Sequence, residues 1–329
     1  MKIKETYKTK EKIMNNSLTE EQVKVLNMSQ SVINEVRKVI IGKDEIIIKV
    51  LLSILAGGHI LIEDIPGVGK TTLAVALSKA LSLDYKRLQF TPDVLPTDVT
   101  GFTILNKETH KFEYKQGAAL TNLFLADEIN RTSSKTQSAL LEVMEEGKVT
   151  VDGITHKMPD PYIVIATQNP VGSIGTQMLP ESQMDRFIVR LTMGYPNLES
   201  EVAMLKSKQN LVPVDNVRPV VSAEDILHAR KVVENIYVSD QVFQYIVMLA
   251  NVTRNNEYIK LGLSPRGTIA LLRMTKATAL LIPDDVIYSF KDVVLHRLVF
   301  SSKAKINGFT GEQILKGVIS SVQVPRVSK

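Results

Sequence analysis

The chain has 329 residues, of which 44% are hydrophobic and 23% charged, and its formal net charge is +5. These values are ordinary for a globular protein with one large domain or two of average size. The sequence contains no cysteine, which excludes a disulfide framework and a thiolate metal site. No run of Lys and Arg interleaved with aromatic residues is present, so we do not expect nucleic acid as a partner.

The N-terminal segment, residues 1–16, carries lysines where a secretory signal needs an apolar run, and we expect a flexible basic tail. The segment 17–21 has the character of a helix capping box and predicts a helix that extends to about Val39. The most apolar stretch, 46–62, is interrupted by Lys49 and His59 and is too broken for a membrane span. These features predict a cytoplasmic protein.

Residues 59–195 alternate between apolar strands and helices. Strands are predicted at 59–64, 86–91, 122–128, 162–169 and 187–193, with an amphipathic helix at 70–82. Almost wholly apolar strands separated by helices are typical of an α/β fold whose parallel sheet is covered on both faces.

Two segments, 101–115 and 148–158, interrupt this alternation and have the pattern of β-hairpins inserted into the core. In the second, Asp152-Gly153 is a strong signal for a two-residue turn.

Beyond residue 196 the pattern becomes helical. Helices are predicted at 199–210, 222–236, 239–254, 265–282, 284–300 and 311–322, and no strand is expected there. We therefore predict an α/β core over residues 17–196, followed by an all-helical domain over 197–329.

The strand at 59–64 leads through a glycine-containing turn into the helix at 70–82, which is the setting of a phosphate-binding loop. The backbone N–H groups of residues 67–72 would point at phosphates at the positive end of the helix. Lys70 would neutralise the β- and γ-phosphates, and Thr71 would ligate Mg²⁺. The usual pattern has a glycine where Asp64 stands, but Gly67 and Gly69 still allow a close backbone approach.

The strand at 122–128 ends in Asp127 and Glu128. Asp127 could hold the shell of the Mg²⁺ ion, and Glu128 could polarise the attacking water, which together are what phosphoryl transfer requires. Such a pair alone is often a helix cap, but the phosphate loop favours the functional interpretation. Asn169, at the end of the next strand, could hold the water and sense the γ-phosphate, or could be a turn residue before Pro170.

Two arginines complete the candidate site. Arg186 directly precedes the strand at 187–193, and the alternative to a functional role is a local ion pair with Asp185. Arg266 lies in the first turn of a predicted helix, where a cation opposes the helix dipole. That cost suggests a nearby anion such as a phosphate, although exposed arginines are also common at this position.

Over residues 25–195 the sequence resembles the MoxR family of AAA+ ATPases. The resemblance depends on the segments "IEDIPGVGKT", "LQFTPDVLPTDVTG", "LADEINRTSSKTQSALLEVMEEGKVTVDG", "VIATQNP" and "LPESQMDRF". Many members of that family have an acidic residue at the position of Asp64, so the loop is expected to work.

The resemblance implies a role for each candidate residue. The nucleotide would be held by the Walker A loop, which consists of Pro66, Gly67, Val68, Gly69, Lys70, Thr71 and Thr72. Asp127 and Glu128 form the Walker B motif, and Asn169 matches sensor 1. The adenine would pack on Ile40, Ile41 and Gly42.

The resemblance also assigns the two arginines. Arg186 matches the arginine finger, which acts on the nucleotide of a neighbouring subunit, and Arg266 matches sensor 2 in a helical lid. Both hairpins resemble features of the clade that includes magnesium chelatase and the replicative helicases.

The family suggests ATP and Mg²⁺ as cofactors and a homo-oligomeric ring of six subunits. Its members are chaperone-like, help mature protein complexes or insert metal cofactors, and often work with a protein that has a von Willebrand factor A domain.

Three other functions can be compared with this one. A DNA motor of the same clade would be expected to have basic residues at the hairpin tip, where this chain has Asp152-Gly153. A GTPase would have an Asn-Lys-x-Asp motif, which the sequence lacks. A non-catalytic scaffold would be expected to have lost Lys70 or Glu128, and both are present.

Overall fold

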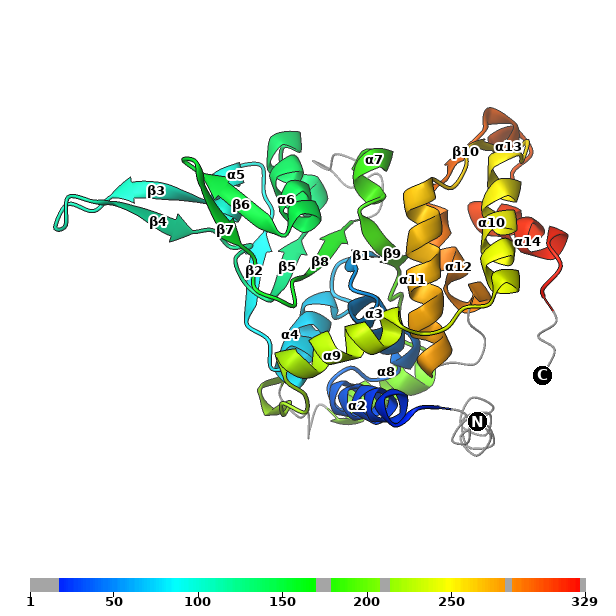
Figure 1. The fold of residues 1–329 in the computed structure, drawn as a ribbon, viewed down its shortest axis with the longest axis horizontal. Helices are drawn as coiled ribbons and strands as arrows, with labels where there is room; N and C mark the ends of the chain where they lie inside the picture. Colours follow the sequence, from blue (N-terminus) through cyan, green and yellow to red (C-terminus); the bar gives the residue numbers. More distant parts are fainter. Residues whose placement is uncertain (1–17, 170–178, 208–213, 282–285, 326–329) are drawn as a thin grey trace.

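The computed structural model describes residues 18–169, 179–207, 214–281 and 286–325. The predicted basic tail, residues 1–16, lies outside these ranges. Figure 1 shows a central sheet with helices on both faces, a long hairpin projecting on one side and a group of helices on the other.

The central sheet has five parallel strands in the order β2-β5-β8-β1-β9. These strands are β1 (His59–Glu63), β2 (Tyr85–Gln89), β5 (Leu123–Asp127), β8 (Ile163–Gln168) and β9 (Phe187–Leu191). All five were predicted from the sequence, and the α/β class with a parallel sheet is confirmed. Because the strands are parallel, all their carboxyl ends lie at one edge of the sheet and all their amino ends at the other.

Successive strand residues face opposite sides of the sheet, and both sides are buried. Ile60 and Ile62 of β1 belong to the core formed with α2 (Glu20–Arg37), α3 (Asp44–Leu55) and α4 (Lys70–Ala80). Leu61, between them, belongs to a second core formed with α5 (Pro96–Thr100) and α6 (Ser134–Glu146). Burial on both faces explains why the inner strands β5 and β8 are largely apolar, whereas the edge strand β2 is polar and partly exposed.

The N-terminal helix α2 begins after Thr19, whose Oγ1 accepts a hydrogen bond from the backbone N–H of Gln22 while Gln22 Oε1 accepts one from the backbone N–H of Thr19. This is the predicted capping box. The apolar stretch 46–62 is divided between α3 and β1. Within the described ranges, no helix is long and apolar enough to cross a membrane.

Both predicted hairpins are present. One joins β3 (Gly101–Leu105) to β4 (Phe112–Gln116) and extends away from the core (Figure 1), and the other joins β6 (Lys148–Val151) to β7 (Ile154–Lys157). At the second turn, Asp152 and Gly153 have φ angles of 48° and 79°, as a tight two-residue turn requires. The rings of Tyr114 and His156 stack with centroids 3.8 Å apart and join the hairpins.

The C-terminal part is mainly helical, as predicted. Its helices are α8 (Leu198–Ser207), α9 (Ala223–Glu234), α10 (Asp240–Arg254), α11 (Pro265–Leu281), α12 (Val286–Val294), α13 (Ser302–Ile306) and α14 (Gly311–Ser321). The short helix α7 (Glu181–Met184) precedes β9.

The expectation that this part would contain no strand was wrong. β10 (Ile259–Leu261) pairs antiparallel with β11 (Val299–Phe300). These strands are only three and two residues long, so neither produces a periodic pattern, and only tertiary contact between distant segments reveals them. The predicted helix over 284–300 likewise ends at Val294 and is followed by a 3₁₀ turn, Leu295–Arg297.

The C-terminal helices share a core with the rest of the molecule. Helix α9 packs against α2 and α3, and α11 packs against α3. Ile226 of α9 and Leu271 of α11 are buried in the same apolar cluster as Ile60 of β1. The boundary near residue 196 therefore stays a prediction.

Candidate active site

The phosphate loop lies between β1 and α4, at the carboxyl edge of the sheet. Gly67 and Gly69 have φ angles of 85° and 97°. A Cβ atom would meet nothing within 4 Å at Gly67 and only Met193 Cε, at 4.0 Å, at Gly69. Glycine is thus required by the left-handed backbone rather than by a lack of space. The loop places the first turn of α4 at the carboxyl edge of the sheet. The N–H groups of this turn have no partner within the helix and are available to bind an anion.

Lys70, the first residue of α4, is 7% exposed, and its Nζ donates to the backbone carbonyl of Asp64 at 2.7 Å. Burial lowers the pKa of Lys70, while the carboxylates of Asp127, Asp64 and Glu128 act in the opposite direction. The loop lysine and the acidic pair predicted from the sequence are therefore neighbours.

Asp64 has a structural task that explains why an acidic residue stands where a glycine is usual. Its side chain is buried and accepts hydrogen bonds from the backbone N–H of Ile65 at 2.8 Å and of Gly194 at 2.6 Å. The Nζ of Lys43 donates to the carbonyls of Met193, Gly194 and Tyr195. The hydrogen bonds of Asp64 and Lys43 together attach the turn that follows β9 to the phosphate loop. Sequence reasoning missed Lys43, because a lysine before a helix has no distinguishing pattern.

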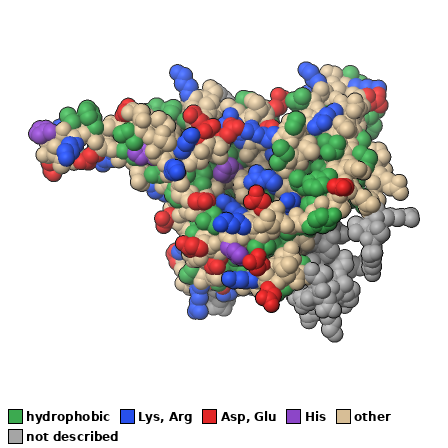
Figure 2. Space-filling view, in the orientation of Figure 1, with side chains coloured by type: hydrophobic (Ala, Val, Ile, Leu, Met, Phe, Trp, Pro, Cys, Tyr) green, Lys and Arg blue, Asp and Glu red, His purple; other side chains and the backbone are tan. Residues whose placement is uncertain are grey.

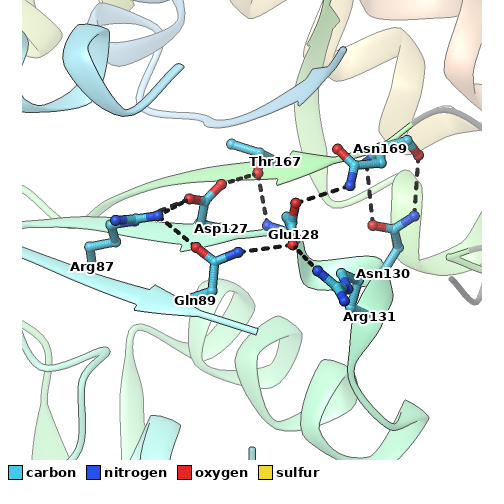
Figure 3. A network of polar contacts seen from close by, with 8 residues as sticks. All are labelled: Arg87, Gln89, Asp127, Glu128, Asn130, Arg131, Thr167 and Asn169. Carbon is cyan, nitrogen blue, oxygen red and sulfur yellow. Dashed lines mark hydrogen bonds and ion pairs between the residues drawn. The ribbon is translucent and has the colours of Figure 1, made fainter. Parts of the chain in front are cut away.

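Asp127 ends β5 and is held at both carboxylate oxygens (Figure 3). Oδ2 accepts from Nε and Nη2 of Arg87 at 3.1 and 2.7 Å, and Oδ1 accepts from Oγ1 of Thr167 at 2.6 Å. Its side chain is 9% exposed, and a carboxylate this buried needs such partners. Sequence reasoning did not identify Arg87, which comes from the neighbouring strand β2.

Glu128 has φ 57° and ψ 47°, a left-handed conformation that costs a non-glycine residue roughly 1–2 kcal/mol. Its carboxylate accepts hydrogen bonds from Asn169, Gln89 and Arg131, at 3.0, 2.8 and 2.8 Å. Burial acts to raise the pKa of Glu128, but the bonds from Arg131 and Asn169 outweigh it, and the pKa is lowered. Glu128 is therefore an ionised and fixed acceptor at neutral pH.

Asn169 follows β8 and is fixed from both sides. Its backbone N–H donates to Oδ1 of Asn130 at 3.3 Å, and Nδ2 of Asn130 donates back to its carbonyl at 3.2 Å (Figure 3). Its Oδ1 is buried and has no hydrogen-bond partner in the part of the chain that the structure describes. A simple turn residue would not account for its bond to Glu128.

The predicted adenine segment lies beside the C-terminal helices. Ile40 is buried, and Gly42 has a φ angle of 72°. A Cβ atom on Gly42 would come within 2.1 Å of Oγ of Ser200, so helix α8 packs directly on this glycine. Gly42 and Met193 line a cavity of about 420 Å³, and Met193 also lies against Gly69 of the phosphate loop.

The two predicted arginines lie together, away from the phosphate loop. Both form ion pairs with Glu145, near the end of α6, and Nη1 of Arg186 is 3.0 Å from this carboxylate. Nη1 of Arg186 also donates to the carbonyl of Leu141 at 2.7 Å. Asp185 is bound by Arg297 instead, at 2.6 Å, so the local pair of Asp185 with Arg186 is not formed.

This arginine cluster belongs to the amino edge of the sheet. Arg186 precedes Phe187, which pairs with His59 at the start of β1, and Nε2 of His59 lies 3.0 Å from the carbonyl of Met144, next to Glu145. The phosphate loop follows the other end of β1. The five residues of β1 separate the two edges by on the order of 15 Å. The structure therefore does not bring Arg186 and Arg266 to the phosphate loop of their own chain.

Comparison with known proteins agrees with this fold. Residues 59–189 match the ATPase family associated with various cellular activities, and residues 251–318 match the AAA lid domain. With the five-stranded parallel sheet, the phosphate loop and the helical lid, these matches define an AAA ATPase.

The chain belongs to the MoxR family of these ATPases. It is 34% identical over 309 residues to the chaperone MoxR1 of Mycobacterium tuberculosis, a match that covers 89% of this chain and 81% of that protein. It is 46% identical over 299 residues to the uncharacterized protein YeaC of Bacillus subtilis, covering 89% and 93%. The crystal structure of an ATPase candidate from Cytophaga hutchinsonii has a TM-score of 0.86 at 36% identity and covers 93% of this chain and 98% of that one.

Proposed function

We propose that this chain hydrolyses ATP to ADP and phosphate and uses the energy to remodel or mature protein complexes. The observation that carries the proposal is Glu128: its backbone is in a strained left-handed conformation, and its ionised carboxylate is held by Asn169 near Lys70 of the phosphate loop. Backbone strain of this kind is typical of functional positions.

Each residue at the carboxyl edge has a part in this chemistry. The N–H groups of residues 67–72 and the ammonium of Lys70 bind the phosphates. Glu128 accepts a hydrogen bond from the attacking water and orients it, and Asn169 restricts the position of Glu128. The adenine packs on Ile40, Ile41 and Gly42, beside α8.

The side chains present fit Mg²⁺ that arrives with a nucleotide. Among the described residues, no group of three or more His, Asp or Glu side chains could hold a metal alone. Mg²⁺ keeps several waters and phosphate oxygens and takes few protein ligands, so the hydroxyl of Thr71 and the carboxylate of Asp127 suffice. The ion would neutralise charge on the transferred phosphate.

We propose further that the active site is shared between chains. Arg186 and Arg266 lie at the amino edge, too far from the phosphate loop of their own chain, so we assign them to the γ-phosphate of a neighbour. An interface that joins the amino edge of one copy to the carboxyl edge of the next uses different surfaces, and repetition of it gives a ring if the rotation closes. The family suggests six subunits.

We propose a protein client, in line with the name chaperone given to the relative from Mycobacterium tuberculosis. Insertion of a metal cofactor and a partner with a von Willebrand factor A domain are further expectations from the family. The DNA motor remains the alternative. In this chain the tip of the β6–β7 hairpin is Asp152-Gly153, where a DNA motor would be expected to have basic residues. On the face in Figure 2, acidic and basic side chains are interspersed. A salt-dependent DNA-binding assay separates the two.

Mixing of two inactive variants tests the shared site. Arg186→Ala keeps the carboxyl edge intact, and Glu128→Gln keeps the amino edge intact, so a mixed oligomer contains complete sites. We expect the mixture to hydrolyse ATP faster than the sum of its components, and wild-type activity per chain to rise with protein concentration. If mixed oligomers form without restored activity, and dilute monomer works at full rate, the shared site is wrong.

A further inference from the structure

Glu145 connects the two arginines and has no role in the chemistry described so far. It lies in the last turn of α6, and each of its carboxylate oxygens pairs with a different guanidinium. Arg186 and Arg266 are 80 residues apart in the sequence; Arg186 directly precedes β9, and Arg266 lies at the start of α11. One carboxylate thus brings a core residue and a lid residue together.

The backbones that carry these arginines are also linked. Asp185, next to Arg186, accepts from Nε of Arg297 at 2.6 Å and from Oγ of Ser264 at 3.1 Å. Ser264 in turn accepts from the backbone N–H of Gly267 in the first turn of α11. These hydrogen bonds link the segment before β9, which carries Arg186, to the start of α11, which carries Arg266.

Glu145 is the acidic partner that both arginine side chains share, while Arg186 is also held by the carbonyl of Leu141. Two guanidinium groups at close range repel each other, and a carboxylate between them compensates that repulsion. The side chains of Arg186 and Arg266 remain 28% and 49% exposed, and Glu145 and Arg186 line a cavity of about 490 Å³. The group carries a net charge of +1 in a position that another molecule can reach.

We propose that Glu145 is a positioning residue that holds Arg186 and Arg266 side by side, so that both meet the γ-phosphate of ATP bound by a second copy of this chain. The inference rests on the proposed shared site. Without Glu145 the arginines would separate and have to be brought together at each turnover, which removes the preorganisation that electrostatic catalysis needs.

The test uses Glu145→Gln, which keeps the shape of the side chain and removes its charge. We expect kcat to fall by about one to two orders of magnitude, as is typical of misplaced catalytic groups. The KM for ATP should change little, because the phosphate loop lies at the other edge of the sheet. The matched control is Glu146→Gln, on the same helix, whose carboxylate lies 3.6 Å from Lys148 and whose loss should leave kcat unchanged.

Mixing separates positioning from a general structural role. Glu145→Gln mixed with Glu128→Gln should regain activity, because the second variant supplies intact arginines. Glu145→Gln mixed with Arg186→Ala should not, because both variants are defective at the same edge. Wild-type or raised kcat in Glu145→Gln, or recovery with Arg186→Ala, overturns the inference. If Arg186→Ala mixed with Glu128→Gln also fails, the shared site itself is wrong and the inference falls with it.

Discussion

The two edges of the sheet are built in different ways. At the carboxyl edge, Lys70 is buried and donates to the carbonyl of Asp64. Asp127 and Glu128, at the end of β5, are largely buried and accept several hydrogen bonds each. At the amino edge, Arg186 and Arg266 are partly exposed and share one carboxylate. The first site is fixed within one chain, whereas the second is partly exposed, as the proposed shared site requires. Substitutions at the two edges should therefore affect different properties.

The largest effect is expected at the amino edge. Arg186→Ala should lower ATP hydrolysis by about three to five orders of magnitude, the contribution of an arginine supplied to a γ-phosphate in trans. ATP affinity, measured by equilibrium binding, should stay near that of the wild type because the phosphate loop is intact. The control is Lys148→Ala, which removes a cation from the same cavity. A loss of ATP affinity in Arg186→Ala would contradict the separation of the two edges.

The next effect is expected at the carboxyl edge. Glu128→Gln should lower single-turnover hydrolysis by about two orders of magnitude or more, since the water loses its acceptor. Binding of ATP with Mg²⁺ should be preserved. Lys70→Ala provides the contrast, because it should weaken nucleotide binding itself. Near-normal turnover in Glu128→Gln would remove this residue from the mechanism.

The smallest expected effect is on the free energy of unfolding. It should be larger for a substitution at the buried carboxyl edge than for one at the partly exposed amino edge. Asp64→Ala leaves the N–H of Gly194 without its acceptor and should lower the free energy of unfolding by about 1–3 kcal/mol. Arg186→Ala breaks a partly exposed ion pair and should cost only about 0–1 kcal/mol. Urea denaturation of both variants measures the difference, with Asp64→Asn as the control that retains an acceptor oxygen. Equal losses would show that the carboxyl edge is no more rigid than the amino edge.

Much of the carboxyl edge could be predicted from the sequence because its signals are local. Asp127, Glu128 and Asn169 stand at the ends of apolar runs, and in a parallel sheet such ends meet at one edge. Lys70 and Thr71 follow the glycine turn after the apolar run of β1. The partners that fix these residues could not be predicted in the same way. Arg87 and Lys43 contact groups 40 or more residues away, and an isolated Arg or Lys has no periodic pattern.

By itself, the sequence determined the α/β class, the five strands, the two hairpins and the glycine turn between β1 and α4, because each depends on residues close together in the chain. Tertiary structure alone decided that Asp64 attaches the turn after β9, that β10 pairs with β11, and that Glu145 joins Arg186 to Arg266. It also decided that these arginines lie at the opposite edge from the phosphate loop. The physical reason is that the direction of the strands and the packing of the lid decide which residues distant in the chain come into contact. A local sequence pattern carries no information about either.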